Sequence, residues 1–395
     1  NSFVQASILD LYDPDRSKEI KKNGKKTTWK KFSEKLKNID KSKTAILSGS
    51  FSSPSHSSLK NSLESESQEI RWYCYDPINN ENEINAVSEL LKKKYVPNYS
   101  FDKASCILSL DSDFLNMDDN PIRNTKDFSS KRKVENKKST MNRLYVVEGS
   151  LTITGAMADH RKRLSQNQID QFIYDLWQRF ENNKNSDTFI NAVYKDLEKN
   201  KGKSIIKGGS RLSQESHELI IRMNNSLGNI GEDKPISYIY SENVHLSSSS
   251  EYEKLIDKME SGEIECLCIL DSNPVYFAKN NQKFEAALKK VKTSIHFGMH
   301  YDETASKCTW HIPKAHYLES WGDCQSIDGI VSIIQPLIKP LYDSVYTDLD
   351  ILSLIESPSA DIKPISKAYD IIYKTYLNGW KRFLNNGITD TEEVE

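Results

Sequence analysis

Residues Asn273 to Leu337 read NPVYFAKNNQKFEAALKKVKTSIHFGMHYDETASKCTWHIPKAHYLESWGDCQSIDGIVSIIQPL, and this stretch decides the fold. Its pattern predicts a strand end and turn at Asn273-Pro274, then a helix, and then a strand over Thr293–His300. An acidic turn follows at 301–304, and a second short strand ends at Pro313. A strand, a helix and a second strand in this order are typical of one unit of a parallel α/β sheet.

The same alternation continues towards the N-terminus. Hydrophobic spacing predicts helices at 81–94, Gln166–Phe180, 213–227 and 251–261. Charged residues without apolar periodicity at 118–140 predict an exposed loop. The predicted strands are Thr44–Ser48, Glu69–Tyr75, Ala104–Leu110, Asn142–Val147, Ser204–Ile206, Ile236–Tyr240 and Ile264–Leu270. Strands separated by helices predict an α/β fold with two units of mainly parallel sheet flanked by helices.

Composition excludes several classes of function. The 395 residues are 37% hydrophobic and 28% charged, with a net charge of -2, so no field of one sign indicates binding to nucleic acid or to a membrane surface. The longest apolar runs, such as Ile264–Leu270, fall far short of the ~20 residues that cross a bilayer, so we expect no direct membrane span. No export signal is visible after Asn1.

Six cysteines lie at positions 74, 106, 266, 268, 308 and 324. No pair shows the C-x-x-C spacing of zinc or cluster ligands. Cys266 and Cys268 alternate within a predicted strand, so both side chains should face one side of the sheet. We expect buried free thiols there, and a disulfide or metal pair is the alternative.

Two glycine turns are candidates for binding an anion. Ser48-Gly49-Ser50 and Gly208-Gly209-Ser210 both follow predicted strands, where backbone N–H groups can hold a phosphate at a helix N-terminus. Neither turn fits G-x-G-x-x-G or G-x-x-x-x-G-K-[ST]. Tight turns between strand and helix are the simpler interpretation.

Polar clusters offer further candidates. Asp159-His160-Arg161 precedes a predicted helix and either binds a ligand or organises the turn and caps that helix. His296 and His300, four apart on a predicted strand, should share one face, while His311 and His316 flank the end of the next strand. No H-E-x-x-H pattern supports a metal site. The lysine run at 131–138 predicts a solvated loop, with partner docking as the alternative.

Several blocks together resemble one protein family. These are QASILDLYDPDR at 5–16, SPSHSS at 53–58, YDP at 75–77, ILSLDSDFL at 107–115 and MNRLYVVEGSLTITGAMADHR at 141–161, along with the stretch 273–337. The set resembles the molybdopterin oxidoreductases, and HYLESWGD with QPLIKPLY is closest to the iron–sulfur/molybdopterin-like subunit of alternative complex III, a quinol:cytochrome c oxidoreductase. The resemblance implies a discontinuous α/β domain at 27–70 plus 204–355 and an inserted α/β domain at 71–203. An N-terminal extension at 1–26 and a C-terminal helical tail at 356–395 complete that expectation.

The resemblance also carries expectations about cofactors and function. Active relatives carry an N-terminal cysteine cluster motif and a Cys, Ser or Asp metal ligand; the motif is missing here, and Cys74 stands near the ligand's place by rough alignment. We therefore expect no cofactor in this chain, with iron–sulfur clusters in a ferredoxin-like half downstream. The implied role is a structural and docking module, not catalytic alone, that works with a membrane quinol-binding subunit and a cytochrome c-type subunit at the periplasmic face of the bacterial inner membrane. The alternative is the middle portion of an active molybdenum or tungsten bis-pterin oxidoreductase, with molybdopterin bound between its halves.

Overall fold

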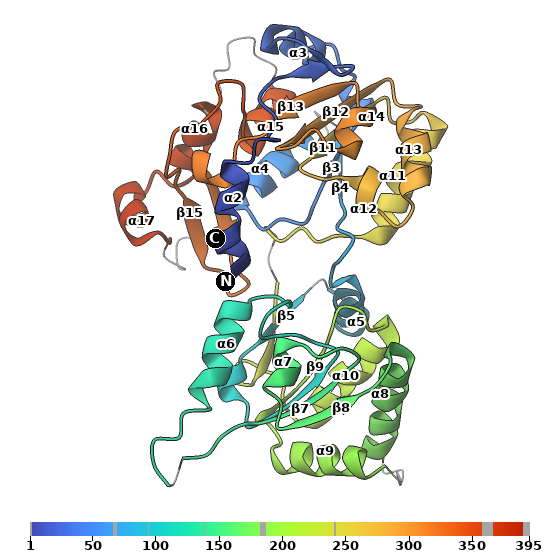
Figure 1. Cartoon of the computed structure of the whole chain (residues 1–395), viewed down its shortest axis with the longest axis vertical. Helices are drawn as coiled ribbons and strands as arrows, with labels where there is room; N and C mark the ends of the chain where they lie inside the picture. The colour runs from blue at the N-terminus through green and yellow to red at the C-terminus, as the bar shows by residue number, and fades with distance from the viewer. Residues whose placement is uncertain are drawn as a thin grey trace. The chain divides into compact units, whose positions relative to one another are not determined.

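The computed structural model describes residues 2–65, 69–93, 95–137, 139–181, 187–240, 242–357 and 366–389. The chain forms two compact units. The continuous unit is the single segment Asn80–Tyr240, and the discontinuous unit combines Ser2–Asn79 with Ser241–Glu395. Figure 1 shows helices packed around a central sheet in each unit. The predicted fold class, α/β with mainly parallel sheets flanked by helices, is confirmed.

A seven-stranded sheet in the order β2-β1-β13-β12-β11-β3-β4 organises the discontinuous unit. The five strands from β13 to β4 run parallel, and the β1–β2 hairpin joins antiparallel at the β13 edge. Its strands are β1 (Lys21–Lys22), β2 (Lys25–Lys26), β3 (Thr44–Ser48), β4 (Arg71–Cys74), β11 (Cys266–Leu270), β12 (Thr293–Gly298) and β13 (Trp310–Pro313), with a separate antiparallel pair β14 (Gly322–Gln325) and β15 (Val331–Ile334). Its helices are α1 (Ser2–Ala6), α2 (Ile8–Leu11), α3 (Trp29–Leu36), α4 (Pro54–Leu63), α11 (Ser249–Ser261), α12 (Pro274–Phe277), α13 (Asn281–Leu288), α14 (Glu303–Lys307), α15 (Asp348–Glu356), α16 (Ser366–Thr375) and α17 (Trp380–Asn386), with short 3-10 turns η1 (Lys41–Lys43) and η3 (Tyr317–Glu319).

Side-chain alternation along β3 builds the two faces of this sheet. Ala45 and Leu47 pack in the core that α11 and α13 cover, whereas Ile46 packs in the core that includes residues of α3, α4 and α15. Successive side chains of a strand point to opposite faces, which gives this division directly. Cys266 and Cys268 both lie in the Ile46 core, which confirms that they face one side, and both are buried free thiols as predicted.

The continuous unit has a four-stranded parallel sheet in the order β8-β7-β6-β9. Its strands are β6 (Cys106–Leu110), β7 (Arg143–Glu148), β8 (His160–Arg163) and β9 (Ser204–Gly208), beside an antiparallel pair β5 (Val96–Tyr99) and β10 (Ile236–Ile239). Its helices are α5 (Glu81–Leu91), α6 (Pro121–Ser130), α7 (Ile153–Ala156), α8 (Gln166–Phe180), α9 (Thr188–Lys199) and α10 (Gln214–Ser226), with the 3-10 turn η2 (Phe101–Lys103). Helices α8, α9 and α10 share one core with the sheet.

The boundaries of the two units differ from the expected ranges at both places where the chain passes from one unit to the other. Strand β4, expected in the inserted domain, pairs with β3 in the discontinuous unit. Strand β9, expected in the discontinuous domain, pairs with β6 in the continuous unit. The expected boundaries came from the family resemblance, and hydrophobic spacing contains no information on strand partners that could have corrected them.

Local structure corrects two further expectations. Residues 118–140 were expected as an exposed loop, but α6 begins at Pro121 and buries Asn124 and Phe128. Those two residues make a single i, i+4 pair, too little for a visible apolar period. His160 was expected in a turn, but it opens edge strand β8, which is too polar to read as a strand.

The N-terminal residues are integral to the discontinuous unit and are not an extension. Arg16 and Glu319 form an ion pair of 2.7 Å between Nη2 and Oε2, and both side chains are fully buried. Arg16 also donates to the carbonyl of Leu11, while Glu319 accepts from the backbone N–H of Leu341. The described part of the C-terminal tail is also integral, because Ala368 and Ile372 of α16 lie in the same core as Ile46.

Candidate functional site

In each sheet there is one strand from which the chain connections lead to neighbouring strands on opposite sides. In the discontinuous unit, β3 is followed along the chain by β4 on one side and later by β11 on the other. In the continuous unit, β7 and β9 flank β6 in the same way. Open α/β sheets bind ligands at the carboxyl ends of strands where the connections diverge in this manner. The candidate site is therefore the edge after β3 and β11, with a counterpart after β6 and β9.

The turn after β3 is closed by a carboxylate of the chain itself. Asp76 accepts hydrogen bonds from the backbone N–H of Ser50, at 2.8 Å, and from the Ser50 hydroxyl. A Cβ on Gly49 would lie 2.8 Å from Asp76 Oδ1, so glycine leaves room for this carboxylate. Ser247 holds the other side, because its Oγ accepts from Asp76 N–H and its N–H donates to Ser50 Oγ. The donors that would bind an anion at this turn are engaged by Asp76.

The N-terminus of α4 is closed in the same way. Asp323, 4% exposed, accepts at Oδ2 from the Ser55 N–H at 3.1 Å and from the Ser55 hydroxyl at 2.5 Å. It also accepts from the Ser53 hydroxyl and, at 2.8 Å, from the Tyr376 hydroxyl. Burial, together with the neighbouring Asp323 carboxylate, raises the pKa of Tyr376, so its hydroxyl stays a donor. A carboxylate at a helix N-terminus is stabilised by the N–H groups and the helix dipole.

A lysine between two carboxylates completes this edge. Lys314, just after β13, has its Nζ 2.8 Å from Asp271 Oδ2 and 2.9 Å from Asp348 Oδ2. Burial alone would lower the pKa of Lys314, but the charges of Asp348 and Asp271 raise it. His56 Nε2 lies 3.8 Å from Asp348 Oδ2 on the other side. The ammonium charge is thus neutralised by the chain's own side chains.

Cys74 is a buried thiol at the end of β4. It ends β4 in the core, and its Sγ lies 3.7 Å from Ser48 Oγ, which also accepts from Trp72 Nε1. Burial raises the pKa of the Cys74 thiol to about 11. The Cys74 thiol is therefore protonated at neutral pH in the chain without a bound metal. Among the residues that the structure describes, no group of three or more His, Cys, Asp or Glu side chains could hold a metal ion.

The counterpart turn in the continuous unit is closed by main chain. A Cβ on Gly209 would lie 1.8 Å from the carbonyl oxygen of Asp111, so only glycine allows this approach. Gly208 is backed by the side chains of Leu212 and His217. Arg211 reaches back to Asp111 with contacts of 2.8 and 2.5 Å. These contacts account for both glycines without a ligand.

Asp159 and His160 have structural partners. Asp159 accepts two hydrogen bonds from Arg132, at 2.9 and 2.6 Å, and one from Leu144 N–H at 2.7 Å. Burial opposes ionisation of Asp159, but these hydrogen bonds and charges lower its pKa overall. His160 stacks on Tyr145, with ring centroids 4.8 Å apart. Both residues organise the entry to β8.

The structure rearranges the predicted histidine pairs. His300 lies beyond the end of β12 and meets Asp13 at 3.3 Å, so His296 and His300 are not brought together on one strand. Instead, parallel register places His296 beside His311, with their Nδ1 atoms 3.0 Å apart. His311 Nε2 contacts Ser17 Oγ at 2.7 Å, and His316 caps η3.

Sequence reasoning also missed a buried charged group in the continuous unit. Lys207 is 6% exposed, and its Nζ lies 4.4 Å from the centroid of the Tyr99 ring. Burial alone would lower the pKa of Lys207, but Glu83, Asp118 and Asp119 raise it. A single lysine at the end of β9 carries no pattern that would have indicated this cluster.

Comparison with known proteins places this geometry in context. A sequence profile for the molybdopterin oxidoreductase family matches residues 20–355. No curated protein sequence matches the chain. Among solved structures, acetylene hydratase from Pelobacter acetylenicus is similar with a TM-score of 0.63 and 12% identity, over 89% of this chain and 62% of that one. The chain therefore spans less than two thirds of the length of that enzyme. The formyltransferase/hydrolase complex from Methylorubrum extorquens, solved with methylofuran, is similar with a TM-score of 0.56 and 11% identity, over 90% of this chain and 99% of that one.

Proposed function

The chain belongs to the molybdopterin oxidoreductase family, and we propose that it is a cofactor-free structural and docking module of a respiratory electron-transfer complex. The complex oxidises quinol and reduces a c-type cytochrome. Its other parts are a membrane quinol-binding subunit, a cytochrome c-type subunit and a ferredoxin-like half with iron–sulfur clusters. The module lies at the periplasmic face of the bacterial inner membrane. The sequence blocks that resemble the alternative complex III subunit support these assignments.

The edge closed by the chain's own carboxylates carries the proposal. Molybdopterin, the cofactor usual in this family, bears a phosphate group, so its site needs free N–H donors or cations. At this edge the Ser50 donors bind Asp76, the α4 N-terminus binds Asp323, and Lys314 is shared by two carboxylates. A phosphate would have to displace these carboxylates and then face their charge. The residues present at this edge therefore do not fit an anionic cofactor.

An apolar face of the discontinuous unit supports the docking role. Thirteen large hydrophobic side chains on α1, α2, η3, the loop 336–342 and the α16–α17 region are at least 36% exposed: Phe3, Val4, Ile8, Leu9, Tyr12, Tyr317, Leu337, Ile338, Leu341, Tyr369, Tyr373, Leu377 and Ile388. Exposed aromatic and aliphatic groups in such numbers mark interaction surfaces. Within the described ranges, no helix is long and apolar enough to cross a bilayer. In this proposal, partner subunits hold the module at the membrane.

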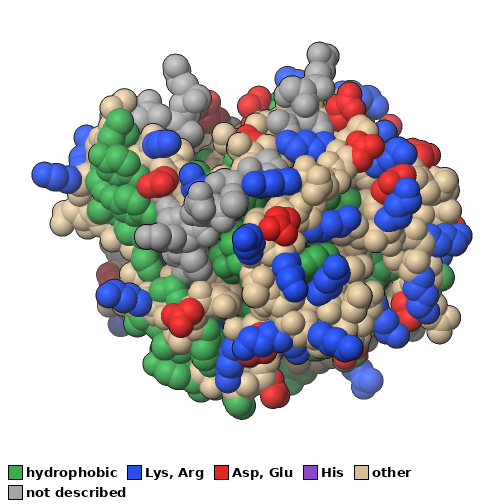
Figure 2. Space-filling model, turned by 90° about the horizontal axis from the view of Figure 1, so that it is seen from above, with side chains coloured by type: hydrophobic (Ala, Val, Ile, Leu, Met, Phe, Trp, Pro, Cys, Tyr) green, Lys and Arg blue, Asp and Glu red, His purple; other side chains and the backbone are tan. Residues whose placement is uncertain are grey.

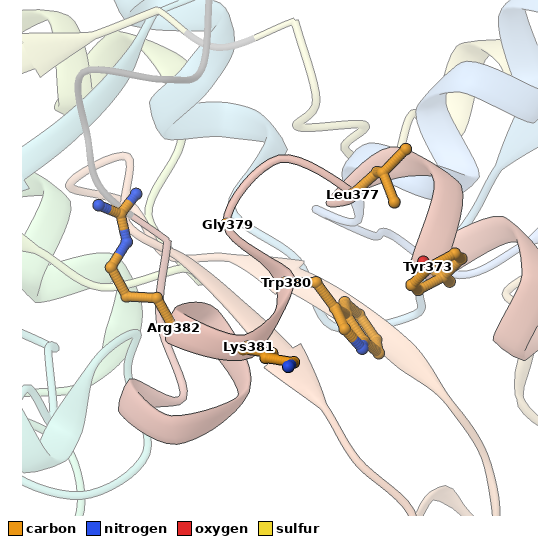
Figure 3. Close-up of a pocket in the computed structure, with 6 residues that line it drawn as sticks. All are labelled: Tyr373, Leu377, Gly379, Trp380, Lys381 and Arg382. Atoms are coloured by element: carbon orange, nitrogen blue, oxygen red, sulfur yellow. The ribbon is translucent and has the colours of Figure 1, made fainter.

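An aromatic groove lies within this face. Tyr373 of α16 and Trp380 of α17 meet edge to face at 5.3 Å, and Leu377 lies between their helices (Figure 3). Together with Lys381 and Arg382 they line an open groove of about 630 Å³. Rigid aromatic side chains at the centre of a contact supply much of the binding energy of protein interfaces. The groove is therefore the part of the face where a partner would bind most tightly.

Metal and pterin analysis tests the absence of a cofactor. The full chain is expressed in a bacterial host supplied with molybdate and tungstate, purified, and measured by mass spectrometry of metals and by fluorescence of oxidised pterin. We expect neither metal nor pterin in stoichiometric amount. One molybdenum or tungsten atom per chain would instead establish the bis-pterin alternative.

Co-purification tests the docking role. The tagged chain is expressed in its native membrane background, and bound haem and iron–sulfur subunits are identified by absorbance and peptide sequencing. We expect Tyr373→Glu with Leu377→Glu to lose them, because charge in the groove prevents apolar contact. Tyr174→Glu, on α8 and 51% exposed, is the matched control and should retain them. Retention of the subunits by the groove variant would refute the role of this face.

A further inference from the structure

Charge is unevenly distributed along this nearly neutral chain. Residues 18–43 contain eleven lysines against only Glu19, Glu34 and Asp40, a local net charge of +8, whereas the whole chain carries -2. Residues 18–43 contain no arginine. The overall charge therefore conceals a strongly basic segment, and the sign of the local field decides which partners it attracts.

The fold gathers part of this segment on one side of the sheet. Lys22 and Lys25 are register partners in the β1–β2 hairpin, so their side chains share a face. Lys22 Nζ lies 5.2 Å from the centroid of Trp310, and Phe32 of α3 packs on the same indole at 5.4 Å. Lys22 and Lys25 therefore lie on the side of the sheet that α3 covers.

Helix α3 extends this basic side. It buries Phe32, Ser33 and Leu36 and leaves Lys30 and Lys31 exposed. We call the following residues the basic face: Lys22, Lys25, Lys30, Lys31, Lys35 and Lys37. Five of the six are exposed, and Lys35 is half-buried. Figure 2, which looks onto this end of the molecule, shows Lys and Arg side chains spread across the surface.

The chemistry of the basic face limits the kinds of partner that it could bind. Lysine ammonium groups are strongly hydrated point charges on flexible stems, without the bidentate geometry with which arginine reads individual groups. The aromatic residues of α3 offer no stacking platform for nucleobases, because Phe32 is buried and Trp29 stacks on Tyr346 with centroids 3.8 Å apart. No large hydrophobic side chain between residues 18 and 43 is exposed to insert into an apolar phase. The partner that fits these features is an extended, negatively charged surface that the lysines contact without any side chain inserting into it.

We propose that the basic face binds the anionic head groups of a lipid bilayer. Clusters of four to eight lysines at a surface are the usual means of such binding, and each contributes only modestly. The contact would orient the module on the membrane independently of the apolar face that docks to protein. This inference rests on the proposed function in one respect, the identity of the membrane. The isolated chain should bind lipid head groups without the respiratory partners.

Vesicle sedimentation tests this inference with the full chain. The probes are phosphatidylcholine vesicles with or without about 30% phosphatidylglycerol, at about 50 mM and 500 mM salt. We expect binding only to the anionic vesicles, and its loss at high salt. The variant Lys22→Gln, Lys25→Gln, Lys30→Gln and Lys31→Gln should bind roughly 1000-fold more weakly, since each lysine contributes about 1 kcal/mol to the attraction.

A matched variant controls for total charge. Lys131→Gln, Lys133→Gln, Lys137→Gln and Lys199→Gln remove the same charge from exposed lysines of the continuous unit, and this variant should bind as the parent does. Equal loss by both variants, or no binding to anionic vesicles at low salt, would overturn the proposal. Tighter binding to polyuridylate than to the vesicles at the same salt would assign the face to nucleic acid instead. Circular dichroism of each variant separates lost binding from lost folding.

Discussion

The two sheet edges of this protein are closed by different means. In the continuous unit, the turn after β9 is closed by main chain, because Gly209 meets the carbonyl of Asp111. In the discontinuous unit, the turn after β3 is closed by the side chain of Asp76, and Asp323 and Lys314 complete the edge through charge. A contact between main chains cannot be removed without moving strands, whereas a side-chain contact can be removed by one substitution. The same type of fold therefore has one edge that is permanently shut and one that could be opened.

Glycine substitutions should show this contrast most strongly. We expect Gly209→Ala to destabilise the continuous unit by about 3 kcal/mol or more, since its Cβ would meet backbone that cannot move aside. Gly49→Ala should cost about 1 kcal/mol, because the Asp76 carboxylate can rotate away. Urea unfolding followed by circular dichroism measures both changes. Equal costs would break the comparison.

Substitution of the paired cations should separate the edges next. Lys314→Met leaves Asp271 and Asp348 without their shared cation and should destabilise the discontinuous unit by roughly 3 kcal/mol. Arg211→Met removes an arginine that is 66% exposed from a carboxylate, Asp111, whose side chain is 2% exposed, and should cost about 1 kcal/mol. Tryptophan fluorescence suits the first measurement, because five of the six tryptophans lie in the discontinuous unit. A larger effect for Arg211→Met would reverse our ranking of the two edges.

Acid should weaken the discontinuous unit through its histidine pair. Burial, with lesser effects of His296 and Lys21, lowers the pKa of His311 to about 3, and burial also lowers the pKa of His296. A histidine that stays neutral when folded takes up a proton on unfolding below its ordinary pKa of ~6.5, so stability is lost as pH falls from there. His311 should cost about 2 kcal/mol between pH 6.5 and pH 5, and His296 should add a loss of the same sign.

The continuous unit should respond less to acid. It holds one such histidine, His217, whose pKa is also lowered by burial. Burial raises the pKa values of Asp118 and Asp119, and those carboxyls favour the folded state as pH falls. The measurement is the urea midpoint at pH 7 and pH 5 for the parent and for His311→Gln. The variant should show a smaller dependence on pH, and an unchanged dependence would exclude His311 as a source.

The smallest effect concerns anion binding at the opened edge. We expect Asp76→Ala to free the N–H and hydroxyl of Ser50 and to gain weak affinity for inorganic phosphate, which the parent chain should lack. Titration calorimetry with phosphate measures this gain, and Asp111→Ala in the continuous unit is the comparison, because its turn stays closed by main chain. Failure of Asp76→Ala to bind phosphate would show that the turn is shaped for closure alone.

Much of the fold could be predicted because buried strands and amphipathic helices have recognisable patterns of apolar residues in the local sequence. Thr44–Ser48 coincides with β3 and Gln166–Phe180 with α8, since continuous apolar runs and 3.6-residue spacing are visible without knowledge of partners. Strand β8, with the sequence HRKR, was missed because an exposed edge strand needs no apolar residue. The assignment of β4 and β9 to sheets failed because pairing is a long-range property.

The site could be predicted only in part, for the same reason. Ser48, Gly49, Gly208 and Gly209 were located correctly at strand ends, because glycine turns are local signals. Asp76, Asp323 and Lys314 close the edge from positions far apart in sequence, and each looks ordinary in its own segment. Their roles depend on three-dimensional proximity, which a single sequence does not record.

The pairing of β1 with β13 also has a consequence for the order in which the two units fold during synthesis. Lys21 and Lys22 can pair with Lys26 and Lys25 as soon as the hairpin is made, but their partners on β13, His311 and Trp310, are synthesised much later, as is Glu319, the partner of Arg16. One edge of β1 therefore stays unpaired until most of the chain has been made. The continuous unit lies in one stretch and needs no such wait, and we expect it to fold first during synthesis. The open edge of the β1–β2 hairpin is then the part most exposed to wrong association, and a hairpin made only of lysines in its strands is poorly suited to pair with another copy of itself.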